Sequence, residues 1–416
     1  MPITLFKNIG AIVQSHPEAP VLQKGSSMTT LNAQEDAWLA IEDDKILAYG
    51  SMKDWETNQN KYSSAKVIDV EGRFILPTFC DSHTHIVYAG SRENEFVYKI
   101  KGMSYEEIAK QGGGIINSAK KLQNTSEEEL IENAQRRINE MIKMGTGAIE
   151  IKSGYGLTTQ DEIKMLRVIR SLKKTNDIAI KSTFLGAHAM PVEYIENRKG
   201  YIDEITGKML PQIAEEGLAD YCDVFCDKGF FTVEETDTIL AAALKLGMKP
   251  KIHANELDFS GGIQVGVKYG AVSVDHLEFT GDEEIEVLLN SNTIPTLLPS
   301  TAFFLRLHYP PARQMMERGL PLSLASDYNP GSSPSGNMFF IMSLACIQMK
   351  MLPEEVINAT TINASYAMEV NQTHGSITPG KTASFMITEK IPSYTYLMYS
   401  FGRPCINEVY IKGKKI

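Results

Sequence analysis

The sequence predicts an α/β protein built on a (β/α)₈ barrel of the TIM type, with a small β-sandwich domain formed by the N- and C-terminal segments. Three observations favour this architecture. Short apolar strands alternate with amphipathic helices from about residue 74 to about residue 365, a pattern typical of parallel α/β folds. Eight strand candidates occur in that region, which is the number a closed barrel requires. Strand-like segments with a different pattern precede and follow it.

The eight barrel strands are predicted from short apolar segments. An open doubly wound sheet would use similar strands, but its glycine fingerprint after the first strand is absent. The run Gly112–Gly114 follows a predicted helix instead. The barrel is therefore the favoured interpretation. The predicted strands cover residues 79–85, 148–153, 178–187, 221–226, 251–256, 272–278, 293–298 and 322–327.

Several helices between these strands carry recognisable end signals. Glycines after a lysine-containing last turn, at Gly145 and Gly247, predict helix ends. A hydroxyl residue followed three positions later by Glu predicts a helix start, because the two side chains cap each other's backbone amides. Such capping boxes are predicted at Ser104/Glu107, Ser126/Glu129, Thr159/Glu162 and Thr232/Glu235.

The two ends of the chain predict short strands that alternate polar and apolar residues. Candidates lie at 37–49, around the turn-like Glu42-Asp43-Asp44, and at 66–70, 384–388 and 407–412. We therefore expect an N-terminal part of the β-sandwich at 1–73, the barrel at 74–365, and the C-terminal part of the sandwich at 366–416.

Composition narrows the class of protein. The 416 residues carry 41 Lys and Arg against 51 Asp and Glu, a net charge of −10, which argues against a nucleic-acid partner because phosphate binding needs clustered cations. The longest apolar run, Met338–Met349, is too short to span a membrane. The N-terminus lacks the pattern of a secretory signal, so we expect a cytoplasmic protein. The five cysteines form no CxxC pair and predict buried, reduced thiols.

The positions of the histidines in the sequence predict a functional site. Of eight in the chain, five lie at or just beyond the carboxyl ends of predicted strands, which is the face where barrel proteins build their sites. Residues two apart on a strand point the same way, so His83 and His85 should direct two imidazoles to one place. The five are His83, His85, His188, His253 and His276. No site role is expected for His16, His308 or His374.

A metal site is the favoured interpretation of this arrangement. A lone His-x-His pair can also be a solvated strand end, but His253 ends the fifth predicted strand and Asp327 ends the eighth. Three imidazoles and one carboxylate then converge, a ligand set suited to catalytic Zn²⁺ or Fe²⁺ with an open position for water.

These residues and several further motifs resemble the amidohydrolase superfamily. The first strand reads Pro-Thr-Phe-Cys-Asp-Ser-His-Thr-His at 77–85. Within the superfamily the resemblance is to the branch that opens the cyclic amide of 4-imidazolone-5-propanoate in histidine degradation, and it spans nearly the whole chain. The added motifs lie at 88–93, 111–115, 150–156, 184–189, 327–332 and 375–383.

The resemblance implies one Zn²⁺ or Fe²⁺/Fe³⁺ ion per chain and a homodimer. It implies that the substrate is 4-imidazolone-5-propanoate and the product N-formimidoyl-L-glutamate. The implied metal ligands are His83, His85, His253 and Asp327. The implied substrate-binding residues are Arg92, Tyr155, His188, Glu256, Asn329, Gly331 and Ser332.

The expected chemistry is attack of an activated water on the ring amide, with Asp327, His276 and Glu256 as the catalytic groups. Asp327 could accept the proton of the water and pass it to the leaving nitrogen, and His276 could stabilise the developing oxyanion. Glu256 could orient a ring N–H or carry a proton. Arg92 is expected to grip the propanoate with two hydrogen bonds.

Two positions depart from the superfamily pattern: Thr78 stands where Gly is usual, and Ser384 replaces a usual Asp. Thr78 therefore requires a negative φ at the entry to the first strand. Lys152 invites comparison with the carboxylated lysine of two-metal relatives, but one metal already has a full ligand set without it. The polar segment 194–210 has no predicted role.

Two alternatives stay open. A one-metal deaminase of a nucleobase-like ring shares the same histidine, glutamate and aspartate pattern and would release ammonia. A catalytically silent barrel that serves as a scaffold would be expected to have lost metal ligands, and none of the four is missing. The sequence does not decide between zinc and iron, because the same ligands accept both.

Overall fold

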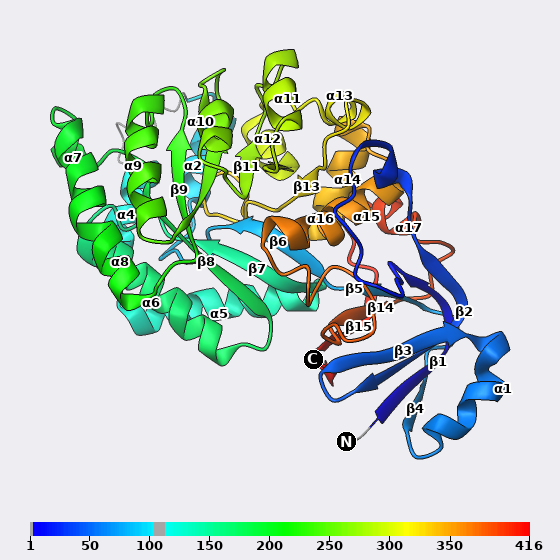
Figure 1. Ribbon diagram of the computed structural model, residues 1–416. Helices are drawn as coiled ribbons and strands as arrows, with labels where there is room; N and C mark the ends of the chain where they lie inside the picture. Colours follow the sequence, from blue (N-terminus) through cyan, green and yellow to red (C-terminus); the bar gives the residue numbers. More distant parts are fainter. Residues whose placement is uncertain (1–2, 104–112) are drawn as a thin grey trace.

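The computed structural model describes residues 3–103 and 113–416 and contains two sheets of different kinds (Figure 1). One is an eight-stranded parallel sheet wound into a barrel, and the other is a mixed sheet built from both ends of the chain. The predicted fold class is confirmed. In Figure 1 helices surround the barrel, while both termini lie in the mixed sheet at the lower right.

All eight predicted barrel strands form, and each is parallel to its neighbours in chain order. The apolar side chains of these strands are buried together with those of the surrounding helices. The last strand is the shortest and ends before the chain turns into the site. The strands are β6 Phe79–Thr84, β7 Thr146–Lys152, β8 Ala179–Ala187, β9 Tyr221–Cys226, β10 Lys249–Ala254, β11 Ser273–His276, β12 Ile294–Leu297 and β13 Ser323–Leu324.

The barrel closes between β6 and the segment that follows β13. The carboxylate of Asp81 accepts hydrogen bonds from the backbone N–H of Ser326 at 2.9 Å and from its hydroxyl at 2.6 Å. One step further on, the N–H of Asp327 donates to the carbonyl of His83 at 2.9 Å. The first and last strands of the barrel, far apart in sequence, are thereby fixed to each other at the carboxyl-end face.

Two of the four predicted helix starts are confirmed, and one of these two has the full capping box. Ser126 caps α5, and Thr232 and Glu235 form a capping box on α9. Helix α6 is capped by Thr158, one residue before the predicted position, and the prediction of a box at Thr159/Glu162 was wrong. Glu162 instead accepts three backbone amides of the preceding loop, at 154, 156 and 157. The box predicted at Ser104/Glu107 lies outside the described residues.

The predicted helix ends are confirmed, since Gly145 and Gly247 follow α5 and α9 with φ of +89° and +82°. No helix of the described residues combines the length and the apolar character that crossing a lipid bilayer needs. The barrel helices are α2 Glu93–Ile100, α4 Ile115–Gln123, α5 Glu127–Lys143, α6 Thr159–Thr175, α7 Arg198–Glu204, α8 Leu210–Glu216, α9 Val233–Lys245, α10 Gly262–Lys268, α11 Asp282–Leu289, α12 Pro299–Leu305, α13 Ala312–Glu317, α14 Met338–Met349, α15 Pro353–Thr360 and α16 Ile362–Ala367.

The polar segment that had no predicted role is helical and covers β8. Helices α7 and α8 are joined by a π-helical turn at Ile205–Met209. Tyr201 is fully buried, and its hydroxyl donates to the carbonyl of Gly186 in β8 at 2.8 Å. The segment is therefore amphipathic, with the apolar face packed on the barrel and the charged face outside.

The mixed sheet joins the two ends of the chain. Strand β1 pairs with β2 antiparallel and with β4 and β5 in parallel, and β5 pairs with β14. Its core includes Phe6, which meets Phe385 and Tyr410 edge to face at 5.2 and 5.1 Å. The strands are β1 Ile3–Val13, β2 Ala33–Glu42, β3 Lys45–Ser51, β4 Lys66–Asp69, β5 Phe74–Pro77, β14 Phe385–Thr388, β15 Ile406–Ile411 and β16 Lys414–Lys415. The short helix α1 Trp55–Asn58 follows β3, and α17 Tyr396–Tyr399 packs against α14.

Strand β1 had no sequence prediction, because its alternation is broken. Asn8 has a φ of +53°, and the register of the β1–β2 pairing shifts between Phe6 and Ile9. The domain boundaries remain predictions, although β5, at 74–77, pairs within the mixed sheet rather than the barrel. All five cysteines are free; four are buried as predicted, while Cys346 is partly exposed.

The two departures from the superfamily pattern touch each other. Thr78 keeps a negative φ, as expected, and its backbone N–H donates to the carbonyl of Ser384 at 3.2 Å. Gly147 in β7 makes room for the threonine: a Cβ there would lie 2.2 Å from Thr78 Oγ1. The bulkier Thr78 at the start of the barrel therefore fits because Gly147 on the next strand has no side chain.

Replacing Gly147 with Ala should lower the free energy of unfolding by about 1–3 kcal/mol, because the new methyl overpacks against Thr78. In a Thr78→Gly background the same change should cost less than half as much. Urea unfolding measures both. Gly207→Ala is the control, since a Cβ there meets nothing within 4 Å; equal costs in the two backgrounds would contradict the packing argument.

Candidate metal centre and substrate pocket

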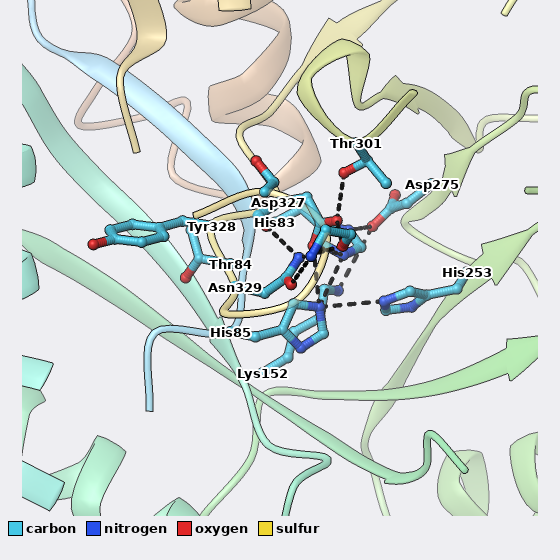
Figure 2. A network of polar contacts seen from close by, with 12 residues as sticks. His83, Thr84, His85, Lys152, His253, Asp275, Thr301, Asp327, Tyr328 and Asn329 are labelled. Atoms are coloured by element: carbon cyan, nitrogen blue, oxygen red, sulfur yellow. Dashed lines mark hydrogen bonds and ion pairs between the residues drawn. The ribbon is translucent and has the colours of Figure 1, made fainter. Parts of the chain in front are cut away.

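Three histidine nitrogens converge at the carboxyl-end face of the barrel (Figure 2). Nε2 of His85 lies 3.2 Å from Nε2 of His83 and 3.3 Å from Nε2 of His253. His83 and His85 come from the end of β6, and His253 comes from β10. All three are buried and could hold a metal ion between them.

Asp327 faces the same point from the loop after β13. Its Oδ1 lies 3.4 Å from His85 Nε2 and 3.6 Å from His83 Nε2. Its Oδ2 accepts a 2.6 Å hydrogen bond from the hydroxyl of Thr301, which fixes the carboxylate plane. The backbone of Asp327 is left-handed, with a φ of +52°, and strain of this kind occurs where a side chain must be aimed at a site. The structure therefore brings the three predicted histidine ligands together and places the Asp327 carboxylate beside two of them.

The protonation state of the histidines is the one that metal binding requires. Nδ1 of His83 lies 2.6 Å from Oδ2 of Asp275, so that nitrogen carries the proton and Nε2 keeps its lone pair. Burial and nearby positive charge lower the pKa of His83 and of His85 well below the ordinary value, which favours neutral imidazoles. Nδ1 of His253 lies 3.0 Å from Asp223 Oδ2 in a similar arrangement. Neutral imidazoles with their lone pairs facing inward are what Zn²⁺ or Fe²⁺ requires.

A buried ionic network lies beneath the histidines, and the sequence analysis missed it. Lys152 Nζ contacts Glu150 at 2.7 Å and Asp223 at 2.8 Å, and lies 3.6 Å from Asp275. Lys251 pairs with the other oxygen of Glu150. All five of these side chains are fully buried. The sequence did contain a signal for this network, which was charged residues at alternate positions of apolar strands. Such residues point to the same side of the strand, and charges that face the barrel interior must be paired.

This network keeps Lys152 cationic. Burial by itself would lower the pKa of Lys152, but the carboxylates of Asp223 and Glu150 raise it. Burial likewise opposes ionisation of Asp223, while His253 and Lys152 lower its pKa. The amine of Lys152 is thus occupied by ion pairs and supports the histidines from below.

His276 lies beside the metal centre, with its ring 5.3 Å from that of His253. Its Nδ1 is 3.7 Å from Oε2 of Glu256. Burial raises the pKa of Glu256 to about 8. Burial would lower the pKa of His276, but the neighbouring carboxylates, Glu256 first, raise it to about 10. The pair therefore provides a proton donor and a proton acceptor close to the ligands.

Arg92 is held in place by a buried carboxylate. Its guanidinium forms an ion pair with Glu95 at 2.7 Å, and Glu95 also accepts the N–H of Gly114 at 3.1 Å. A Cβ on Gly331 would lie 2.1 Å from Arg92 Nη1, so the glycine leaves space for the guanidinium. Glu95 was not predicted, although it lies three residues after Arg92 on one helical face.

Tyr155 and His188 are buried beside the metal centre. The His188 ring stacks on that of His85 at 5.3 Å and lies 5.4 Å from the ring of Tyr155. Nδ1 of His188 contacts the carbonyl of Gly154 at 2.9 Å, which leaves Nε2 available. Burial lowers the pKa of His188 to about 3, so its ring is neutral.

The loop after Asp327 is held by its own side chains. Asn329 accepts the N–H groups of Gly331 and Ser332 at 2.7 and 2.8 Å, and its amide donates to the Asp327 carbonyl at 2.7 Å. The hydroxyl of Ser332 is 3.4 Å from Asp327 Oδ2. Asn329 therefore shapes this loop, and Ser332 lies beside the Asp327 carboxylate.

Comparison with known proteins agrees with this site. A model of the amidohydrolase family matches residues 74–416. Imidazolonepropionase of Christiangramia forsetii is 54% identical over 412 residues, covering 99% of both chains, and that of Flavobacterium johnsoniae is 54% identical over 414 residues, covering all of both. Imidazolonepropionase of Thermoanaerobacter pseudethanolicus is 43% identical, covering 94% of this chain and 92% of its own.

Solved structures show the same fold at low identity. Guanine deaminase of E. coli superposes with a TM-score of 0.75 at 12% identity and covers 100% of this chain and 99% of its own. An adenosine deaminase of Xanthomonas campestris with bound zinc gives 0.70 at 16%, covering 99% of this chain and 92% of its own. At such identities the likeness concerns the fold alone.

The matched family model and the metal-type site define the class of this protein as an amidohydrolase. The chain belongs to this family and, within it, to the imidazolonepropionases.

Replacing Lys152 with Met should lower the free energy of unfolding by about 3–5 kcal/mol, because Asp223 and Glu150 lose a buried partner. Chemical denaturation of the metal-free protein measures the change. Lys199→Met removes an exposed ion pair with Asp203 and should cost at most about 1 kcal/mol. Equal effects of the two substitutions would contradict a structural role for the buried network.

Proposed function

We propose that this protein hydrolyses the cyclic amide C–N bond of 4-imidazolone-5-propanoate to give N-formimidoyl-L-glutamate. The observation that carries the proposal is a metal-type centre of three buried histidines, in a chain 54% identical to imidazolonepropionases over its whole length. The lactam ring fits a site that activates water, and the propanoate tail fits a guanidinium.

The proposed metal ligands are His83, His85, His253 and Asp327, holding one Zn²⁺ or Fe²⁺/Fe³⁺ ion per chain. The close approach of three Nε2 atoms, two of them with a carboxylate at Nδ1, supports this set. Such an ion supplies activation of water near neutral pH and a Lewis acid for the ring carbonyl.

The chain's own residues then move the protons. Asp327 accepts a proton from the attacking water at its carboxylate and later delivers it to the leaving ring nitrogen. His276 donates a hydrogen bond to the oxyanion that develops on the former carbonyl oxygen. Glu256, whose raised pKa lets it keep or give a proton near neutrality, orients a ring N–H.

Arg92 binds the propanoate carboxylate with its planar guanidinium, which Glu95 holds in place and for which Gly331 leaves space. Tyr155 and His188 complete the pocket between that carboxylate and the metal. Gly331 and Ser332 supply backbone and hydroxyl contacts, and Asn329 fixes their loop.

The proposal includes a cytoplasmic homodimer. An apolar surface of exposed Phe303, Tyr399 and Phe401 supports self-association, and the rings of Phe303 and Phe401 lie against Phe340 at 5.6 and 6.2 Å. Surface patches of this kind are typical of protein contacts.

The direct test gives metal-quantified protein freshly generated 4-imidazolone-5-propanoate and follows the loss of its ultraviolet absorbance, with an ammonia assay in parallel. Metal-dependent loss without ammonia, together with N-formimidoyl-L-glutamate by mass spectrometry, is expected. No turnover by protein with one metal per chain would refute the proposal, and release of ammonia from a nucleobase-like ring would favour a deaminase.

Replacing His253 with Ala should remove metal and activity together, because one of three converging imidazoles is lost. Metal analysis by plasma mass spectrometry, alongside the turnover assay, measures both. His374→Ala is the matched control, since its ring contacts Thr373 outside the site. A fully metallated and active His253→Ala protein would show that the ligand assignment is incorrect.

Replacing Arg92 with Ala should lower kcat/KM for the propanoate substrate by roughly 10- to 150-fold, the equivalent of about 1.5–3 kcal/mol for a charged hydrogen bond. Arg92→Lys keeps the charge but loses the planar fork, so an intermediate loss is expected. Steady-state kinetics distinguish the variants. An unchanged kcat/KM in Arg92→Ala would exclude the carboxylate-binding role.

A further inference from the structure

Glu278 is a buried carboxylate beside the site that the proposed reaction does not use. It follows β11 by two residues, and its side chain is fully buried. Within the described part of the chain, neither of its carboxyl oxygens has a hydrogen-bond partner. Burying a carboxyl group without a partner is costly, so its position calls for an interaction with a nearby group.

The nearest cationic group is the imidazole of His276. Nδ1 of His276 lies 3.8 Å from Oε2 of Glu278 and 3.7 Å from Oε2 of Glu256, so two carboxylates face one nitrogen. That Nδ1 also lacks a partner of hydrogen-bonding geometry among the described residues. One N–H can make one strong linear hydrogen bond, so only one of the two carboxylates can hold it.

The backbone fixes Glu278 in a position from which its carboxylate can hold the Nδ1 proton of His276. His276 and Leu277 both have left-handed φ values, +86° and +71°, which turn the chain sharply after β11. The carbonyl of Glu278 accepts a 2.7 Å hydrogen bond from His308 Nε2, and the next N–H, of Phe279, donates to the carbonyl of Asn255 at 2.8 Å. A strained turn tied at both sides is the kind of backbone that aims a side chain at a functional group.

We propose that Glu278 is a positioning residue: its carboxylate accepts the Nδ1 proton of His276 and thereby aims Nε2 of that ring at the reacting carbonyl oxygen. This assignment rests on the proposed function, and it leaves Glu256 free to contact the substrate ring. Carboxylates that hold the far nitrogen of a functional imidazole fix both its orientation and its tautomer.

Burial raises the pKa of Glu278, so the competing possibility is that its carboxyl group stays protonated. A permanently protonated Glu278 would be only a structural group. Glutamine has the same shape as a neutral carboxyl group, so it would replace such a residue without loss. A carboxylate that holds an imidazole N–H through its charge cannot be replaced in this way.

The experiment compares Glu278→Gln with the zinc-loaded wild type, and Glu283→Gln serves as the control because it removes an exposed carboxylate close by in α11. Glu278→Gln should keep one zinc per chain and lower kcat by roughly 10- to 100-fold with KM little changed, as supporting carboxylates of imidazoles do. Glu283→Gln should match the wild type. A Glu278→Gln kcat within about twofold of the wild type, or a loss confined to KM, would overturn the proposal.

A double-mutant cycle tests whether Glu278 acts through His276. His276→Ala should lower kcat, and adding Glu278→Gln to it should lower kcat no further, because the group that Glu278 positions is gone. If the two losses multiply instead, Glu278 acts by another route and the proposal fails.

A substrate-free measurement separates this proposal from the proposed function. In protein labelled with ¹⁵N-histidine, the ring nitrogen signals of His276 can be assigned by their loss in His276→Ala. The Nδ1 signal should shift in Glu278→Gln and stay in place in Glu283→Gln, and an unmoved signal would refute the positioning role. Failure of wild-type turnover would refute the proposed function alone.

Discussion

The site depends on one constraint: imidazoles can share a cation only if their lone pairs face it, and a fixed partner on the other nitrogen secures this for two of the three. Asp275 and Asp223 take that place for His83 and His253. These carboxylates are themselves buried charges, and Lys152 stabilises both from the barrel interior. An apolar barrel interior would pack as well, so the buried charges are explained by the orientation they impose on the histidines rather than by stability.

Closure of the barrel is the second requirement, because the candidate ligands come from its first, fifth and last strands. The backbone bond from Asp327 to His83, together with the Asp81–Ser326 pair, sets the distance between the two ends of the sheet. At the strand ends the backbone departs from regular strand geometry, because side chains there must point into the site. Left-handed backbone at His276 and Asp327 marks these places, and the surrounding hydrogen bonds maintain it.

Much of this arrangement could be predicted, and the omissions have physical causes. The strand pattern located all eight barrel strands, and alternation on β6 placed His83 and His85 together. The α6 cap was placed one residue late because Thr158 and Thr159 are equivalent in sequence and only the use of Glu162 by a loop distinguishes them. β1 escaped prediction because a bulge interrupts its period of two.

The sequence by itself determined the barrel, the mixed sheet of the chain ends and the group of polar residues at the strand ends, because periodicity and strand-end position are local properties. Only the tertiary structure decided which distant groups meet, such as Lys152 with Asp223 and His83 with Asp275. Partners on different strands, or across a strained turn, are set by barrel register and closure. Those depend on packing of the whole chain, so no local pattern encodes them.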